Sequence, residues 1–102
     1  WAFNLTNQKG EAVGVEWGTP GVSSPGLENY VPLPPEQMQA LLKGASPELV
    51  ACDTSQRGWT QVTLTPEAAT AQWRFVSSVT EPTYQTIVGE PMLTRRNARR
   101  LA

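Results

Sequence analysis

The sequence predicts an α+β fold that is mostly antiparallel β with one or two helices. Two observations predict it: an alternating, Thr- and Val-rich stretch from residue 59 to 77, and apolar residues at helical spacing from residue 35 to 44. The 102 residues suffice for one domain, and nine Pro and eight Gly indicate many turns. We expect the folded part over residues 1–94 and a basic tail over residues 95–102.

The N-terminal part predicts two strands. Residues 1–8 mix apolar and polar positions, a polar turn covers residues 7–10, and a second strand covers residues 12–17. In this second strand period-two alternation places Val13, Val15 and Trp17 on one face and Glu16 on the other. Glu16 is therefore expected either to face solvent or to point into a polar site.

Residues 18–35 are rich in Gly, Pro and Ser and predict a long loop, either a functional loop or a surface connection. The helix over residues 35–44 begins at Pro35, and its apolar stripe is expected to be core rather than a cofactor site. That stripe consists of Met38, Leu41, Leu42 and Ala45. Residues 46–48 are expected to open a second, single-turn helix.

The strongest pattern is a β-hairpin with strands over residues 59–65 and 70–77. Alternation turns Ala71, Trp73 and Phe75 to one face, which we expect to be buried. The opposite face is wet, or is covered by the rest of a larger protein. A last short strand is expected over residues 84–88, and the tail after it has helix-forming composition.

The residue inventory argues against a complete catalytic centre in this chain. It has no His, one Asp (Asp53) and one Cys (Cys52), so it offers neither a set of metal ligands nor the usual base for a Ser or Cys nucleophile. Lys9 and Lys43 lie in polar segments and are expected to be exposed. We therefore predict no catalytic residue and no metal ligand here, with Cys52 a buried apolar residue and Asp53 and Arg57 a local ion pair or cap.

Charge is distributed unevenly. Four of the eight basic residues lie in the last eight positions, so residues 1–94 carry four basic against nine acidic groups. The basic run is expected to be a solvated helix face or a frayed terminus, and the net charge of −1 does not indicate a nucleic-acid partner. No apolar stretch approaches the roughly 20 residues of a membrane span. The first residue is Trp, from which we expect the N-terminus to be a cut that leaves any targeting signal upstream.

Seven short segments suggest a family by their order and spacing: Trp1-Ala2-x-Asn4-Leu5, Val15-Glu16-Trp17, Pro20-x-Val22-x-Ser24-Pro25-Gly26, Pro47-x-Leu49, Asp53-x-Ser55-x-Arg57-Gly58-Trp59, Val62-Thr63-Leu64-Thr65-Pro66-Glu67 and Trp73-x-Phe75-Val76. Together they resemble the C-terminal end of alkaline phosphatase D (PhoD-like) metallophosphatases over residues 1–79. Trp17 and Trp59 stand where the family usually has Phe and Tyr, and Ala45-Ser46-Pro47 replaces an Asn-Pro pair.

The resemblance implies that this chain is the C-terminal part of an α/β/β/α metallophosphatase sandwich. In the family, the residue matching Trp1 follows a Gly-Asp-(Ile/Val)-His motif of the metal centre. The intact enzyme would be a bacterial protein, secreted or held in the periplasm or cell envelope, that hydrolyses phosphate mono- and diesters with bound iron and calcium. Its catalytic part would lie upstream, and the isolated segment would be inactive.

Asn4 and Glu16 are the candidate site residues, because they would lie closest to the upstream motif. We predict that one of them orients a metal ligand from the second coordination shell, with a strand-end cap or a surface group as the alternative. A different class of function also stays open, namely a non-catalytic β-rich module whose Trp-bearing sheet or Arg-rich tail binds a partner.

Overall fold

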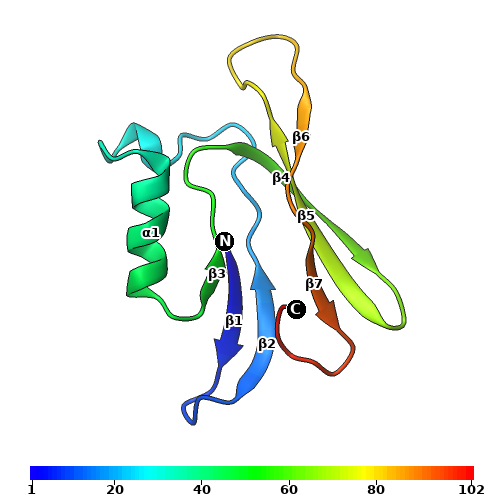
Figure 1. The fold of residues 1–102 in the computed structure, drawn as a ribbon. Helices are drawn as coiled ribbons and strands as arrows, with labels where there is room; N and C mark the ends of the chain where they lie inside the picture. Colours follow the sequence, from blue (N-terminus) through cyan, green and yellow to red (C-terminus); the bar gives the residue numbers. More distant parts are fainter.

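The computed structural model describes residues 1–102 and confirms the α+β class. It contains one α-helix, one short 3-10 helix and seven strands, and every strand pair is antiparallel. Figure 1 shows the helix beside one edge of a central sheet and a second sheet beyond the opposite edge. No helix has the length and apolar character needed to cross a lipid bilayer.

The first sheet has the order β2-β1-β3. Strand β1 (Ala2–Thr6) lies between β2 (Ala12–Trp17) and β3 (Leu49–Ala51), and the expected N-terminal hairpin is confirmed. Its register shifts between Leu5 and Thr6, so Val13 has no partner and is 50% exposed. The predicted alternation therefore holds for Val15 and Trp17, which are half-buried, but not for Val13.

A long crossover joins β2 to β3. It contains a short helix η1 (Leu27–Asn29) that we did not predict, and α1 (Pro35–Ala45), which matches the predicted helix to within one residue. The single-turn helix expected at residues 46–48 is wrong, because these residues form a turn into β3. Glu48 is held there by β1: its carbonyl accepts the Asn4 N–H at 2.9 Å and its carboxylate accepts the Thr6 N–H at 2.7 Å.

The second sheet has β5 at its centre. Strand β5 (Ala68–Val76) pairs over residues 69–76 with β4 (Arg57–Leu64), and its other edge is shared by β6 (Thr86–Val88) and β7 (Met92–Arg95). The predicted hairpin and the short strand before Gly89 are confirmed. Thr65 closes the hairpin turn, since its N–H donates to Ala68 O at 2.9 Å and its Oγ1 accepts the Ala68 N–H at 3.1 Å.

The expected helical character of the C-terminal tail is wrong. Arg95 ends strand β7, and the following residues form a turn in which Asn97 and Arg99 have positive φ angles of 65° and 56°. The Leu101 N–H then donates to Asn4 Oδ1 at 2.7 Å, so the end of the chain returns to β1. Residues 92–95 pair with the edge of β5 that β4 leaves free. If this segment were a helix, the backbone N–H and C=O groups along that edge of β5 would stay unpaired. All four arginines of the tail are exposed, as expected.

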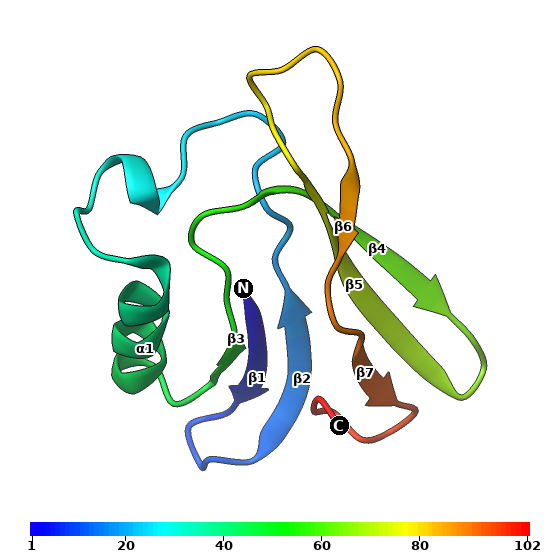
Figure 2. The ribbon, with the colours of Figure 1, turned by 45° about the horizontal axis from the view of Figure 1, so that its top comes forward.

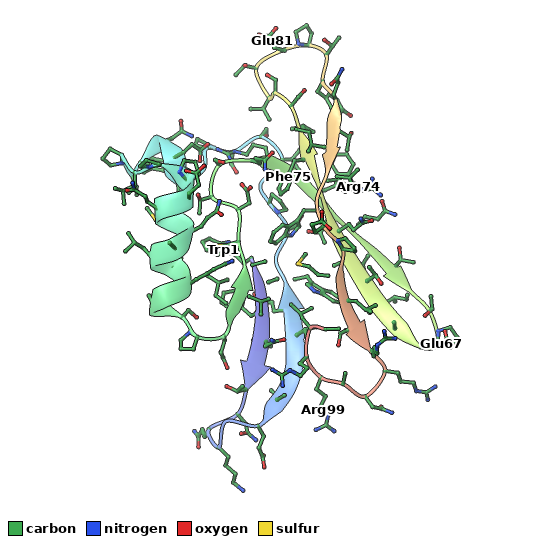
Figure 3. The ribbon with its side chains drawn as sticks, in the orientation of Figure 1. Trp1, Glu67, Arg74, Phe75, Glu81 and Arg99 are labelled. Atoms are coloured by element: carbon green, nitrogen blue, oxygen red, sulfur yellow. The ribbon has the colours of Figure 1, made fainter.

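The core lies between the two sheets. Ala2 of β1 packs with Trp73 and Phe75 of β5, which are 8% and 5% exposed. Around them are half-buried side chains from both sheets and the C-terminus: Trp17, Ala51, Met92 and Leu101. Figure 3 shows Phe75 and its neighbour Arg74 on opposite sides of β5, as the predicted alternation requires. The burial of Ala71, Trp73, Phe75 and Cys52 is confirmed.

The helix does not contribute to this core. None of its residues is buried, and Leu41 is 61% exposed, so the expected core role of the stripe is wrong for this chain. The stripe still marks an apolar helix face, and the strand that lies beside the helix is β3, at the edge of the first sheet (Figure 2). An amphipathic helix owes most of its stability to packing of its apolar face, and here that packing is incomplete.

The molecule is flat and has a large surface for its mass. Its extents are 43 × 32 × 17 Å, and its radius of gyration of 14.9 Å exceeds the roughly 13 Å of a compact domain of this length. The accessible surface is 6935 Å², against roughly 5,700 Å² for a compact monomer of 11.1 kDa. Only eight of the 102 residues are buried, so the two sheets enclose a small core.

Candidate functional site

The two predicted site residues lie on neighbouring strands of the first sheet. Asn4 is half-buried in the central strand β1, and its side-chain oxygen is occupied by the Leu101 N–H. Glu16 is exposed on β2, opposite Phe3 of β1. The structure therefore shows Asn4 holding the C-terminal segment, and the predicted orienting role of either residue toward a metal ligand stays a prediction.

Cys52 and Asp53 are neighbouring residues of metal-ligating types, and the hydrogen bonds of Asp53 show how its carboxylate is used. Both oxygens of Asp53 are used locally: Oδ1 accepts the N–H groups of Ser55 and Gln56 at 3.0 and 2.7 Å, and Oδ2 accepts Gln56 Nε2 at 2.8 Å. This confirms the predicted cap at Asp53. No group of three His, Cys, Asp or Glu side chains comes together elsewhere. No residue of this chain is therefore assigned to the iron and calcium that the resemblance implies for the intact enzyme.

The Cys52 thiol is kept neutral by its surroundings. Burial raises its pKa above the usual value, and Lys43 and the amino terminus oppose only part of that effect. Because metal binding and nucleophilic attack both require the thiolate, this shift disfavours either role at neutral pH. Because the pKa of Cys52 is raised in the folded chain, the thiol of the unfolded chain deprotonates at a lower pH than that of the folded chain. The free energy of unfolding is therefore expected to fall as pH rises above the thiol pKa of the unfolded chain.

We expect the native Cys52 thiol to react with 5,5′-dithiobis(2-nitrobenzoate) at pH 8 at least about tenfold more slowly than in urea, because it is both buried and protonated. The measurement is the rate of thionitrobenzoate release, and Cys52→Ser is the blank. Equal rates in the folded and the unfolded chain would show that the thiol is accessible and would contradict the structure.

The best-organised polar cluster lies where the loop of residues 18–30 meets the start of β4. The loop runs antiparallel to β4 and is bonded to it at three points. Thr19 Oγ1 accepts the Thr60 N–H at 3.1 Å, Gly21 O accepts the Gly58 N–H at 3.1 Å, and Ser24 O accepts Arg57 Nε at 2.5 Å. The long loop expected from composition is therefore an ordered element fixed to the second sheet.

Arg57 is the centre of this cluster. Its guanidinium forms an ion pair with Glu28 of η1, and its side chain is only 11% exposed. The ion pair expected between Arg57 and Asp53 is thus wrong. Glu28 precedes Arg57 by 29 positions, so no local spacing in the sequence indicates the pair. A buried guanidinium is stable only when its donors find acceptors, which Ser24 and Glu28 supply here.

Gly26 makes room for the guanidinium. A Cβ at this position would lie 2.5 and 2.6 Å from the two terminal nitrogens of Arg57. Any side chain there would displace Arg57 from Ser24 and Glu28. Ser24 and Gly26 of the long loop therefore form part of the binding site for the Arg57 side chain.

Two open cavities adjoin the Arg57 cluster and share part of it, namely Ser24, Pro25, Gln56 and Arg57. The first, of about 280 Å³, extends to three aromatic residues: Trp1, Tyr30 and Trp73. The second, of about 460 Å³, extends to the loop after β5 and to Ile87 of β6. Trp1 lies in the middle of the molecule, between the helix and the hairpin (Figure 3). The first cavity therefore begins beside the start of β1.

The base of the loop is fixed to the core at the same place. The Gly18 N–H donates to Trp1 O at 2.8 Å, and Gly18 O accepts Trp73 Nε1 at 3.1 Å. Strand β1, strand β5 and the loop thus meet at Gly18. The sequence identified the aromatic residues but not this junction, because it joins segments 55 residues apart.

No protein-family model, no curated protein and no solved structure matches this chain.

Proposed function

We propose that this chain is the C-terminal structural segment of a secreted, metal-dependent phosphatase or phosphodiesterase of the PhoD-like family. In this proposal the metal centre, with its iron and calcium, is formed by residues N-terminal to Trp1, and residues 1–102 complete the fold around it. The ordered segment series over residues 1–79 suggests the family. The observation that best supports a structural role within a larger protein is the large accessible surface of the chain.

That surface is large enough for a permanent contact. The accessible surface of the chain exceeds that of a compact monomer of the same mass by about 1,200 Å². A stable protein interface buries about 800 Å² of accessible surface on each partner. Fourteen large hydrophobic residues are exposed: Trp1, Val13, Val22, Tyr30, Leu33, Leu41, Val50, Trp59, Val62, Leu64, Val79, Tyr84, Ile87 and Val88. A contact with another part of the same protein would remove such side chains from water, which is the main favourable term in folding.

The arrangement of the elements supports the same proposal. The chain has one helix with an unpacked apolar face and two antiparallel sheets that share a small core. In an α/β/β/α sandwich, further strands and helices would extend both sheets and cover that helix face. Arg57 and Gly58 belong to one of the seven segments that resemble the family, and both bind the loop of residues 18–30 to β4. Such structural roles suit a segment that supports a neighbouring site but supplies none of its metal ligands.

The longer protein that contains residues 1–102 is expected to hydrolyse bis(4-nitrophenyl) phosphate when supplied with iron and calcium, and to lose that activity in a chelator. The purified 102-residue chain should be inactive under the same conditions, since in this proposal the metal ligands lie N-terminal to Trp1. The measurement is 4-nitrophenolate release together with metal content. A longer protein that binds no metal and releases no product would refute the proposal.

The same preparation also tests the two candidate residues. Replacement of Asn4 or Glu16 by Ala should reduce metal content or turnover if either orients a ligand; unchanged values for both would leave them purely structural. If the longer protein is inactive and the isolated chain is monodisperse with a cooperative thermal transition, the alternative of a β-rich binding module is favoured instead.

A further inference from the structure

The loop of residues 95–100, called here the cationic loop, concentrates positive charge on a chain that is otherwise acidic. Four of its six residues are Arg, whereas residues 1–94 carry four basic against nine acidic groups. All four side chains are exposed: Arg95, Arg96, Arg99 and Arg100. The ion pair of this structure joins Arg57 to Glu28, so no carboxylate neutralises an arginine of the cationic loop.

The backbone holds the cationic loop in a closed turn. Thr94 Oγ1 donates to Arg100 O at 2.8 Å and so joins the two ends of the loop. Asn97 and Arg99, both in this loop, are the two non-glycine residues of the chain that have positive φ angles. Such a conformation is uncommon outside glycine, and strained backbone of this kind clusters at binding segments. The four cations are therefore presented from a fixed turn, so a ligand would not have to order a frayed terminus.

The cationic loop lies at one end of the molecule, beyond β7 (Figure 1). In Figure 3 Arg99 lies at this end and points away from both sheets, whereas Glu81 lies at the opposite end. Glu67 is an acidic neighbour, because its carbonyl accepts the Arg96 N–H at 2.7 Å. Charges more than about 8 Å apart are largely screened at physiological ionic strength, so distant carboxylates would weaken the field of the loop only slightly.

The contact surface invoked for the proposed function does not account for this loop. That contact would cover apolar side chains, whereas a guanidinium group is costly to bury unless its donors find acceptors. We therefore expect the four arginines to stay at the surface of the longer protein.

The chemistry of the loop favours phosphate groups arranged on a plane. A guanidinium binds a phosphate through two parallel hydrogen bonds, and every cation of the loop is an Arg. A nucleic acid is usually held by cations that follow several successive phosphates, and the rest of this chain is acidic. A bilayer with anionic headgroups instead offers a layer of phosphates that a loop at one end of a protein can reach with several side chains together.

We propose that the cationic loop binds the surface of an anionic phospholipid bilayer, with its four guanidinium groups on the lipid phosphates. Each basic residue close to such a surface strengthens binding about fivefold. This binding goes beyond the proposed function, because it requires neither a metal ion nor a residue outside positions 1–102.

The test is sedimentation of the chain with sucrose-loaded vesicles of phosphatidylglycerol and phosphatidylcholine in equal parts. Vesicles of phosphatidylcholine alone are the reference, and we expect binding only to the anionic vesicles. Raising the salt from about 0.1 M to about 1 M shortens the Debye length from about 10 Å to about 3 Å and should release the chain. Replacement of all four arginines by Gln should reduce binding to the reference level, and Arg99→Gln alone should weaken it about fivefold.

Lys43→Gln is the matched control, because it removes the same single charge from an exposed position in α1. It should leave vesicle binding within about twofold of the unchanged chain. Circular dichroism checks the fold of each variant, and if the fourfold variant unfolds, the comparison of Arg99→Gln with Lys43→Gln decides. Equal losses in these two variants would show an effect of net charge and would overturn the inference.

Three other results would also overturn it. The first is the absence of binding to the anionic vesicles at low salt, and the second is full binding by a folded fourfold variant. The third is tighter binding to a short DNA duplex than to the vesicles, which would assign the cationic loop to nucleic acid. None of these results depends on phosphatase activity, so they leave the proposed function to its own test.

Discussion

Replacement of Gly58 by Ala is expected to abolish cooperative unfolding of the chain, with a loss in the free energy of unfolding above about 4 kcal/mol. A Cβ at residue 58 would lie 1.9 Å from the carbonyl oxygen of Arg74 and 2.9 Å from the Cα of Phe75. Both atoms belong to the backbone of β5, so the clash cannot be relieved by a side-chain rotation. The paired strands would have to separate at the point where Phe75 enters the core.

Gly44 provides the matched control for this experiment. It lies in α1, and a Cβ there would have no atom within 4 Å. Because Gly is unfavourable inside a helix, Gly44→Ala should raise stability by about 0.5–1 kcal/mol. Urea and thermal unfolding followed by circular dichroism would measure both variants. A Gly58→Ala protein with the wild-type midpoint would show that β4 and β5 are not paired in this register.

Replacement of Trp73 by Ala is expected to lower the free energy of unfolding by about 3–5 kcal/mol. Trp73 is the largest residue of the buried cluster, and it contacts both Ala2 and Phe75, whose ring centroid is 6.0 Å from its own. Its indole N–H also holds Gly18 at the base of the loop. Truncation would leave a cavity between the two sheets and an unpaired carbonyl at the loop junction.

Two further variants separate these contributions. Trp73→Phe keeps an aromatic ring but removes the donor to Gly18 O, which should cost about 1 kcal/mol beyond the effect of the smaller ring. Trp59 is 39% exposed on β4, and Trp59→Ala should cost less than about 1.5 kcal/mol. Urea denaturation with a common m value would establish the ranking. If Trp59→Ala proved as costly as Trp73→Ala, the core would lie on the other face of the second sheet.

The elements that were predicted correctly are those whose signals are local. The hairpin of β4 and β5 has alternating residues and a turn closed by Thr65, and α1 has a Pro start and apolar residues at helical spacing. Strands β3 and β7 were missed because they are short and take their conformation from a neighbour: β3 from β1, and β7 from β5. The tail has residues that favour a helix, but strand pairing and the contact of Leu101 with Asn4 outweigh that weak preference.

The candidate site shows the same division. The prediction that this chain supplies no catalytic residue and no metal ligand was made from the residue types present, and it stays a prediction. The sequence also indicated the cap at Asp53, whose partners lie within three positions. The partner of Arg57 was predicted wrongly, since a charge on a flexible stem can pair with any opposite charge that the fold brings near it.

The sequence by itself determined the α+β class, the helix, the hairpin and the buried face of β5, because composition and periodicity specify local conformation and the side that avoids water. Only the tertiary structure decided that Glu28 and Ser24 hold Arg57, that Gly18 joins Trp1 to Trp73, and that the tail returns to Asn4. These contacts join residues between 17 and 97 positions apart. Their geometry depends on how the two sheets pack, which no local pattern contains.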